Sequence, residues 1–416
     1  MGKRTEQAKP LDAGARLAPR RDFPIFENWP DLIYLDNAAT THKPAAVLSR
    51  LDEFYRLTYA NVHRGVYRLA EEATAAYEEA RRQVAAFIGC EDTGELIFTR
   101  GTTEGINLAA GSLDSLVQDG DEILVTALEH HSNLIPWQQL CRRRSLRLRV
   151  CPVTPAGELD LAALERMLTP RTRVAAFAMV SNALGTVVPA VKVIAAARQA
   201  GAVTVVDAAQ AVPCLPVAVG DLGCDFLVFS GHKMLGPMGI GVLYGRREIL
   251  EKLPPYMTGG EMISRVGWDG AQWAELPQKF EAGTPNAAGA VGLAAAVRYL
   301  EEIGMDRIRA HETELGRRAR ELLGRIPGVR VLGCPAACCG IVSFVVPGIH
   351  PHDLAQFLAR ENIAVRAGRL CAQPLLRTLG VEAVTRVSFY VYNDLAEVEK
   401  MAEAVEKGIR FFKAKK

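Results

Sequence analysis

The sequence predicts an α/β protein with a large domain built on a mostly parallel sheet and a smaller α+β domain at the C-terminal end. Short apolar runs alternate with helical patterns from about residue 96 to residue 230, which is typical of a parallel sheet covered by helices on both faces. From about residue 286 the pattern changes to long amphipathic helices and a few short strands. At 416 residues the chain exceeds one typical core, which also favours two domains.

The large domain is expected to span residues 31–285. Its strands are predicted where short apolar runs end in polar turns, at 32–35, 96–98, 122–126, 146–151, 174–179, 203–206 and 226–229. Its helices are predicted from periodicity and start signals, from Pro44 to about Thr58, from about Glu71 to Gly89, after Thr102, up to about Arg144, at 161–168 and at 191–200. Residues 245–283 are expected to be rich in loops.

The smaller domain is expected to span residues 286–416, and residues 1–30 are expected to form an N-terminal leader. Amphipathic periodicity predicts helices at 288–303, 305–325, 353–360 and from Leu395 onwards. Short apolar runs predict strands at 341–346, 364–366 and 386–390.

Composition and charge restrict the possible functions. The formal net charge of +2 provides neither a basic surface for nucleic acid nor an acidic tail. The nine cysteines are scattered, which fits neither a disulfide scaffold nor a paired zinc site and favours the reducing cytoplasm. The first 21 residues lack the apolar core of a secretory signal. The longest weakly charged run, 174–197, is interrupted by polar residues, Gly185 and Pro189, so a membrane span is not expected.

Lys233 follows the apolar run 226–229 and lies in a glycine-rich turn with Ser230 and His232. A lysine directly after a buried strand is shielded from water, which lowers the pKa of its amine toward the nucleophilic free base. Such an amine forms Schiff bases with carbonyl compounds, pyridoxal phosphate among them. The alternative is an ordinary surface lysine in a loop.

Other polar residues follow the remaining expected strands. The turn at Thr102 opens a helix whose free N–H groups and dipole suit a phosphate, although a plain capped helix is the commoner meaning. Asp207 would be buried unless it faced a cation such as a pyridinium, and a structural hydrogen bond is its alternative role. The adjacent His130 and His131 would stack on a ring or donate to it, or would form only a solvated turn. Because the carboxyl ends of parallel strands meet at one edge, these residues, Asn182 and Lys233 are expected to share one site.

The order of the motifs identifies a resemblance that covers roughly residues 31–400. The motifs are Leu-Asp-Asn-Ala-Ala at 35–39, Asn-Val-His-Arg-Gly at 61–65, Arg-Gly-Thr-Thr-Glu-Gly-Ile-Asn at 100–107, Glu-His-His-Ser-Asn at 129–133, Ser-Asn-Ala-Leu-Gly-Thr at 181–186, Asp-Ala-Ala-Gln at 207–210, Ser-Gly-His-Lys at 230–233, Gly-Thr-Pro-Asn at 283–286 and Arg-Ala-Gly-Arg-Leu-Cys-Ala-Gln-Pro-Leu at 366–375. The chain resembles the class V aminotransferase-like enzymes of fold type I, and most closely the group II (sulfur-mobilisation type) cysteine desulfurases. The resemblance implies a pyridoxal phosphate-dependent transferase with a mostly parallel seven-stranded sheet.

The resemblance also implies roles for individual residues. Lys233 would carry pyridoxal 5'-phosphate as a Schiff base and move protons at the substrate Cα. The ring of the cofactor would contact Asp207 at its nitrogen, Gln210 at its oxygen and His130 on its face, and His130 would also assist proton transfer as a catalytic residue. Asn182 would contact the cofactor as well as the substrate. The phosphate would be held by residues of two subunits, which makes a homodimer part of the expected site: Thr102, Ser230, His232 and, from a second subunit, Thr284. The substrate carboxylate would lie among Asn182, Arg386, Arg366 and Ala38.

Cys371 is the residue that distinguishes a desulfurase. In these enzymes a loop cysteine takes the sulfur of L-cysteine, which leaves alanine and a cysteine persulfide. The nucleophile must be an accessible thiolate, which Arg366 and Arg369 would favour, and a buried inert cysteine is the alternative. The family usually has a histidine before this cysteine, whereas Arg369 and Leu370 stand here. This departure puts turnover and partner response in question more than the reaction class. The compact loop favours group II.

Several alternatives stay open at the level of sequence. The main hypothesis is a cytoplasmic cysteine desulfurase that passes the persulfide sulfur to an acceptor protein, with iron–sulfur cluster assembly as the expected pathway and selenocysteine lyase activity as an alternative. Another class V reaction, transamination or carbon–carbon cleavage with Cys371 incidental, is the second hypothesis, and a non-catalytic cofactor-binding protein is the third. His352 is a candidate contact of the acceptor, or an exposed histidine at a helix start. No metal site is expected, since the adjacent Cys338 and Cys339 do not easily share one tetrahedral ion.

Overall fold

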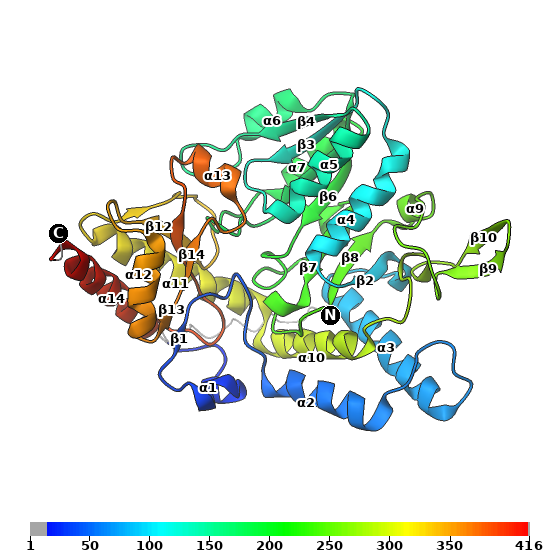
Figure 1. Cartoon of the computed structure of the whole chain (residues 1–416), viewed down its shortest axis with the longest axis horizontal. Helices are drawn as coiled ribbons and strands as arrows, with labels where there is room; N and C mark the ends of the chain where they lie inside the picture. The colour runs from blue at the N-terminus through cyan, green and yellow to red at the C-terminus, as the bar shows by residue number, and fades with distance from the viewer. Residues whose placement is uncertain (1–14, 415–416) are drawn as a thin grey trace, which may run out of the picture.

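The structure, a computed structural model, describes residues 15–414 (Figure 1). A seven-stranded sheet forms the centre of its larger part, in the order β2-β8-β7-β6-β5-β3-β4. The strands are β2 Leu96–Thr99, β3 Glu122–Thr126, β4 Arg147–Cys151, β5 Thr172–Ala178, β6 Val203–Asp207, β7 Phe226–Ser230 and β8 Gly241–Gly245. Strands β3 to β7 pair in parallel, whereas β8 is antiparallel to both of its neighbours. The predicted α/β fold with a mostly parallel sheet is confirmed.

Helices cover both faces of this sheet, which explains why its central strands are apolar runs rather than alternating patterns. In β7, Phe226 and Val228 belong to the core on one face, with α4 Thr102–Leu113 and α5 Ile135–Arg143. Leu227 and Phe229 belong to the core on the other face. That face is covered by α3 Arg68–Phe87, α7 Ala190–Gln199 and α10 Ala287–Ile303. Shorter helices of this part are α2 Ala45–Glu53, α6 Leu161–Met167, α8 Val219–Leu222 and α9 Arg247–Leu250.

The C-terminal part contains an antiparallel four-stranded sheet in the order β11-β12-β15-β14. Its strands are β11 Arg330–Val331, β12 Ile341–Val345, β14 Arg366–Gly368 and β15 Val384–Ser388, and its helices are α11 Met305–Arg325, α12 Pro351–Arg360, α13 Gln373–Thr378 and α14 Leu395–Lys413. Residues 16–36 pack on this part as well, with α1 Ile25–Asn28. Arg16 pairs with Asp394 at 2.7 Å, and the Ala18 N–H donates to the Val391 carbonyl. Residues 1–14 of the expected leader lie outside the described residues.

Two strand predictions need correction. The run at 32–35 forms only β1 Ile33–Tyr34, and it pairs with β13 Ile363–Ala364 instead of joining the large sheet. The seventh strand of the large sheet is β8, for which no strand was predicted because glycines begin and end it. Gly241 is required there, since a Cβ at this position would lie 2.5 Å from Gly101 Cα. The expected loop region also contains a hairpin, β9 Ile263–Gly267 and β10 Gly270–Trp273.

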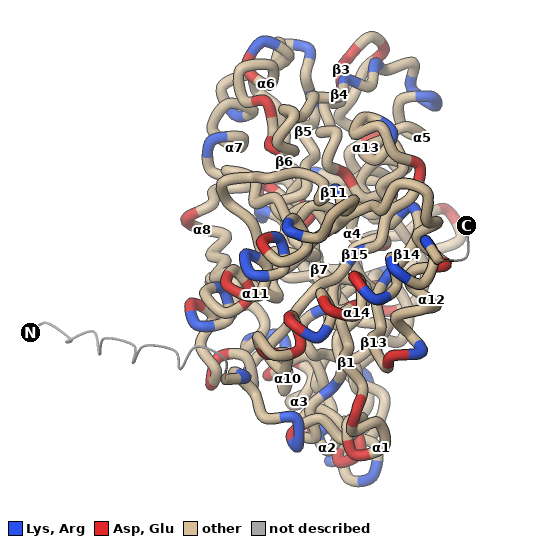
Figure 2. Tube along the Cα trace, turned by 90° about the vertical axis from the view of Figure 1, so that its left-hand side faces the viewer, with Lys and Arg blue, Asp and Glu red and all other residues tan. Residues whose placement is uncertain are grey.

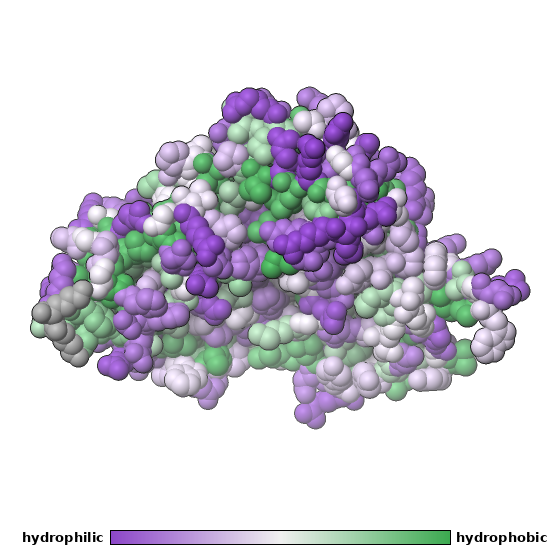
Figure 3. Space-filling model, turned by 45° about the horizontal axis from the view of Figure 1, so that its top comes forward, coloured by the Kyte–Doolittle hydropathy of each residue, from purple (hydrophilic) through white to green (hydrophobic). Residues whose placement is uncertain are grey.

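The surface has no single dominant charge. Figure 2 shows basic and acidic residues interspersed along the described chain. Figure 3 shows hydrophilic and hydrophobic residues mixed over one face, with hydrophobic residues gathered near its middle. Within residues 15–414, no helix has the length and apolarity needed to cross a membrane.

Candidate active site

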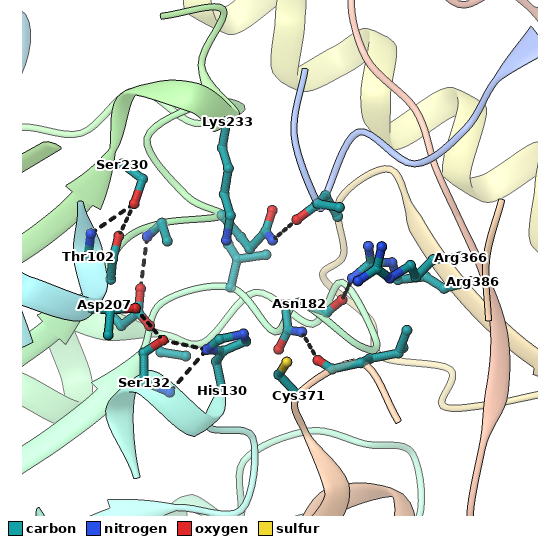
Figure 4. Close-up of a pocket in the computed structure, with 18 of the residues that line it drawn as sticks. Thr102, His130, Ser132, Asn182, Asp207, Ser230, Lys233, Arg366, Cys371 and Arg386 are labelled. Atoms are coloured by element: carbon teal, nitrogen blue, oxygen red, sulfur yellow. Dashed lines mark hydrogen bonds between the residues drawn. The ribbon is translucent and has the colours of Figure 1, made fainter. Parts of the chain in front are cut away.

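A cavity of about 450 Å³ lies where the carboxyl ends of the parallel strands face the C-terminal part of the chain (Figure 4). All but one of the sequence-predicted site residues line it. They are Ala38, Thr102, His130, Asn182, Asp207, Gln210, Ser230, His232, Lys233, Arg366, Cys371 and Arg386. The cavity has two distinct ends: Thr102 and Ser230 lie at one, Arg366 and Arg386 at the other, with Lys233 between them.

Lys233 enters the cavity from a 3₁₀ turn, Gly231–Lys233, that directly follows β7. Its amine makes no hydrogen bond to any residue that the structure describes. Burial lowers the pKa of this amine, an effect that the nearby Asp207 carboxylate partly opposes. The turn is fixed through the His232 carbonyl, which accepts from the Thr41 N–H at 3.0 Å and from Lys43 Nζ at 3.0 Å. Lys233 is therefore a rigidly placed amine that is available for covalent chemistry.

The end of the cavity near Ser230 is suited to an anion. The Thr102 N–H, at the start of α4, donates to Ser230 Oγ at 2.8 Å, and the two hydroxyl oxygens lie 2.7 Å apart. A Cβ at Gly101 would lie 3.1 Å from Ser230 Oγ, so the glycine keeps this approach open. His232 Nδ1 is buried without a hydrogen-bond partner among the described residues. Burial lowers the pKa of His232 to about 4, which keeps the ring neutral and able to donate one hydrogen bond to a phosphate.

Asp207 ends β6 and is 5% exposed. It accepts one hydrogen bond, from the Ala209 N–H at 2.9 Å. Burial raises the pKa of Asp207, while that hydrogen bond and Lys233 oppose the effect. A carboxylate with so little compensation favours a cation in the adjoining cavity.

His130 lies across the cavity from the Lys233 side chain (Figure 4). Its Nδ1 accepts from the Ser132 N–H at 3.1 Å and lies 2.7 Å from Ser132 Oγ. The proton of the neutral ring is therefore on Nε2. Burial lowers the pKa of His130 to about 3, and the positive charge of Lys233 adds to the effect. A neutral, fixed imidazole suits stacking on an aromatic ring.

Gln210 is oriented by its amide nitrogen, which donates to the Ala38 carbonyl at 2.7 Å. This contact connects the loop after β1 with the loop after β6. The second N–H of the same amide makes no hydrogen bond within residues 15–414, so it remains available for a ring oxygen.

The opposite end of the cavity is rich in arginine. Arg386, on β15, is 3% exposed and donates to the Asn182 carbonyl and to Asp36 Oδ1, both at 2.9 Å. Its Nε has no partner in the described chain, and Asn182 Oδ1 has none either. Arg366 lies 3.7 Å from the other oxygen of Asp36. Two guanidinium groups at this end favour a carboxylate ligand, and Arg369 also lines the cavity.

Cys371 lies in the loop between β14 and α13, is exposed, and lines the same cavity as Lys233. Its backbone φ is +51°, and that of Leu370 is +53°, in the left-handed region that residues with a Cβ rarely adopt. Asn182 Nδ2 donates to the Leu370 carbonyl at 2.7 Å and so ties this loop to the large part of the molecule. Cys371 is therefore an accessible thiol held at the cavity by an unusual backbone.

The remaining predicted site residue, Thr284, and the predicted acceptor contact, His352, lie outside the cavity. Thr284 lines a separate cavity of about 490 Å³ with Tyr256 and Met257. His352 is in the first turn of α12, and a Cβ at Gly368 would lie 3.4 Å from its Nε2, so it flanks the strand that leads to Cys371. Within residues 15–414, no cluster of three or more metal-ligating side chains is found.

Three residues that shape the site received no role from the sequence. Asp36 pairs with Arg386, and Thr41 and Lys43 fix the Lys233 turn. The polar cluster after residue 35 was a usable signal for all three. The adjacent histidines singled out His131 for a contact with a ring, but it does not line this cavity and contacts the Cys371 loop instead.

Comparison with known proteins defines the class to which this fold and site belong. The chain belongs to the Aminotransferase class-V family, which matches residues 33–401. It is 46% identical over 394 residues to a probable cysteine desulfurase of Halalkalibacterium halodurans, covering 94% of this chain and 97% of the relative. A probable cysteine desulfurase of Streptomyces coelicolor is 46% identical over 406 residues, 95% and 97% of the two chains.

Solved structures give the same result. The apo structure of a cysteine desulfurase from Thermococcus onnurineus NA1 superposes with a TM-score of 0.90 at 42% identity, covering 97% of this chain and 98% of the other. The cysteine desulfurase CsdA from Escherichia coli superposes with a TM-score of 0.88 at 38% identity, covering 94% and 98%. The resemblance to class V enzymes, and to cysteine desulfurases among them, is confirmed.

Proposed function

We propose that the protein is a pyridoxal phosphate-dependent cysteine desulfurase that converts L-cysteine to L-alanine and carries the sulfur as a persulfide on Cys371. The observation that carries the proposal is the position of Cys371, an exposed thiol lining the same cavity as Lys233 and Asp207. The similarity to relatives named cysteine desulfurase supports it.

The cavity fits the proposed cofactor. The unpartnered His232 Nδ1 and the Thr102–Ser230 pair suit its phosphate, and the weakly compensated Asp207 suits its ring nitrogen. Pyridoxal phosphate supplies an electron sink for bonds at the substrate Cα and Cβ. Lys233, with its lowered pKa and free amine, would hold the cofactor and then accept and return the proton at Cα.

The remaining residues act on the substrate. Arg386, whose Nε has no partner among the described residues, would orient the α-carboxylate beside Asn182, which directs the side chain toward Cys371. The Cys371 thiolate forms a bond to the substrate Sγ while the Cβ–Sγ bond breaks. The electron pair of the broken bond stays with Cβ, which takes up a proton, so the products are L-alanine and a persulfide and no external oxidant is needed.

We infer that the two domains have different roles: residues 31–285 bind the cofactor and residues 286–416 carry the nucleophile.

A homodimer belongs to the same proposal, because Thr284 lies outside the cavity of its own subunit. The loops near Thr284 expose large apolar residues: Met238 is 69% exposed, Tyr256 41% and Met257 42%. Light scattering of the purified protein at twice the 45.2 kDa chain mass would support the dimer, and a monomer mass would contradict it. His352, beside the strand before Cys371, remains our candidate contact for the sulfur acceptor.

Mass spectrometry tests the central claim. After incubation of the holoenzyme with L-cysteine, the Cys371 peptide should gain the mass of one sulfur atom, and L-alanine should accumulate. Cys371→Ala should abolish both, whereas the control Cys334→Ser, at an exposed cysteine outside the cavity, should retain both. Unchanged sulfide and alanine release by Cys371→Ala would instead favour another class V reaction in which Cys371 is incidental.

A further inference from the structure

The backbone that presents Cys371 does not hold its shape by itself. Leu370 and Cys371 occupy the left-handed region one after the other, with φ of +53° and +51°. Residues with a Cβ disfavour this region, so such a conformation persists only when surrounding contacts fix it. Within the loop, one hydrogen bond stabilises this conformation: the Ala372 N–H donates to the Arg369 carbonyl at 3.0 Å. The other contacts come from elsewhere in the chain.

Three hydrogen bonds tie the Cys371 loop to the large part of the molecule. One comes from Asn182 to the Leu370 carbonyl. The other two involve His131, whose N–H donates to the Cys371 carbonyl at 2.8 Å. The Gln373 N–H donates to His131 Nε2 at 3.3 Å. His131 therefore holds the segment from the Cys371 carbonyl to the Gln373 N–H, directly C-terminal to the Cys371 side chain, whereas Asn182 holds the segment before it.

The turn that contains His131 connects the Cys371 loop with His130. It lies in a 3₁₀ turn, His131–Asn133, that follows His130, and the two imidazole centroids are 6.3 Å apart. The turn is anchored in the core by Asn133, which donates to the buried Glu129 carboxylate at 2.6 Å and accepts from Trp137 Nε1 at 2.9 Å. One rigid turn thus fixes the ring of His130 on the cofactor side and the nucleophile loop on the other.

The contact to Gln373 requires a particular state of the His131 ring. Because Nε2 accepts a hydrogen bond, the neutral ring must carry its proton on Nδ1. Burial lowers the pKa of His131, which favours this neutral state. The ring has no part in the cavity that Lys233 lines, so any effect on the reaction passes through the loop.

We propose that His131 is a positioning residue for sulfur transfer: its imidazole Nε2 holds the Gln373 N–H and thereby keeps Cys371 directed at the substrate sulfur. This role rests on the proposed desulfurase function. It concerns only the step in which Cys371 takes sulfur, not the proton chemistry at Cα, which belongs to Lys233.

A matched set of substitutions separates the two steps. His131→Gln retains a hydrogen-bond acceptor at about the position of Nε2. His131→Leu removes this acceptor. His131→Phe also removes it but keeps a packed ring, in case the leucine variant folds poorly. Two readouts are measured on each holoenzyme: exchange of the L-alanine Cα proton for deuterium, and single-turnover persulfide formation on Cys371 from L-cysteine. Exchange needs Lys233 but no thiol.

We expect persulfide formation in the leucine and phenylalanine variants to slow by about five- to tenfold, the rate change that corresponds to one neutral hydrogen bond. Deuterium exchange should stay within about twofold of the wild type, and glutamine should restore most of the persulfide rate. Wild-type persulfide rates in both apolar variants would overturn the proposal. A parallel fall of exchange and persulfide formation would also overturn it, because it would indicate a general structural role. Absence of any persulfide in the wild-type enzyme would instead refute the proposed function.

Discussion

The sharpest test of the cofactor site is the substitution Asp207→Asn. Asp207 is 5% exposed and accepts a hydrogen bond only from the Ala209 N–H, apart from its longer-range attraction to Lys233. If its carboxylate faces a protonated ring nitrogen, the substitution exchanges a charge-assisted hydrogen bond for a neutral one of the same shape. Charge-assisted bonds contribute about 1.5–3 kcal/mol and neutral ones about 0.5–1.5 kcal/mol, so the exchange costs about 1–1.5 kcal/mol. Pyridoxal phosphate should therefore bind about 5- to 12-fold more weakly, at about 1.4 kcal/mol per factor of ten.

The apoprotein should respond in the opposite direction. Burial raises the pKa of Asp207 in the folded state above its ordinary value of 3.8. A group whose folded pKa is raised contributes stability below its unfolded pKa, and that stability is lost as the pH rises through the folded pKa. At neutral pH the wild-type apoprotein therefore bears the cost of a buried charge that asparagine lacks. The Asp207→Asn apoprotein should be equally or more stable in urea unfolding.

Asp225→Asn is the matched control for this experiment. Asp225 is also a buried aspartate beside the same sheet, 9% exposed, but it does not line the cavity. It accepts from the Thr204 N–H at 2.8 Å and pairs with Arg246 at 3.4 Å. Its substitution should lower stability and leave cofactor affinity unchanged, as measured by absorbance titration of the apoprotein. Wild-type affinity in Asp207→Asn, or a joint loss of affinity and apoprotein stability, would refute the assignment of Asp207 to a bound cation.

Two further predictions concern the substrate and the pH dependence of folding. Arg386→Lys should raise the KM for L-cysteine by about 10- to 100-fold. The reason is that one ammonium group cannot replace a planar guanidinium that bonds the Asn182 carbonyl, Asp36 and a substrate carboxylate at the same time. Arg410→Lys, at an exposed site on α14, is the control, and an unchanged KM in Arg386→Lys would contradict the assignment. Burial lowers the folded-state pKa of His42 and His232 to about 4, so the stability of the apoprotein should be complete above about pH 6.5 and decline as the pH falls toward about 4. His42→Gln should reduce that decline in urea unfolding, and an identical pH profile would show that His42 does not cause it.

Most of the large sheet could be predicted from sequence because its strands are short, continuous apolar runs, which is the pattern of strands buried on both faces. In β7, alternate residues belong to the two cores, so every position is apolar and the run is short and continuous. Strand β8 escaped prediction because Gly241 and Gly245 interrupt that signal, although the glycine at 241 is required by the close approach of Gly101. The run at 32–35 was recognisable as extended, but its partner was not. Whether it joins the large sheet or β13 depends on contacts more than 300 residues away in the chain, which local pattern does not encode.

The same distinction applies to the site. Asp207 and Lys233 were predictable, because polar residues at the ends of parallel strands converge at one edge of the sheet. The contacts that fix their surroundings were not predictable, although some of the residues that make them lie in a recognisable polar cluster. Thr41 and Lys43 act on the His232 carbonyl, and His131 acts on backbone groups beside Cys371. Any residue can supply the main-chain group in such a hydrogen bond. The sequence around that main-chain group therefore does not indicate which side chain will bind it.

The contacts between the two parts of the chain determine which chemistry the cavity can perform. Lys233 alone provides a reactive amine, but the groups that would bind the substrate carboxylate and take its sulfur come from β15 and the loop after β14. They reach the cavity through contacts that each join the two parts: Arg386 to the Asn182 carbonyl, Asn182 to the Leu370 carbonyl, and His131 to the Cys371 carbonyl and the Gln373 N–H. Weakening any of these contacts should leave cofactor binding intact and impair sulfur transfer. We therefore expect the reaction that this cavity performs to depend on how firmly the C-terminal part is held against the end of the sheet.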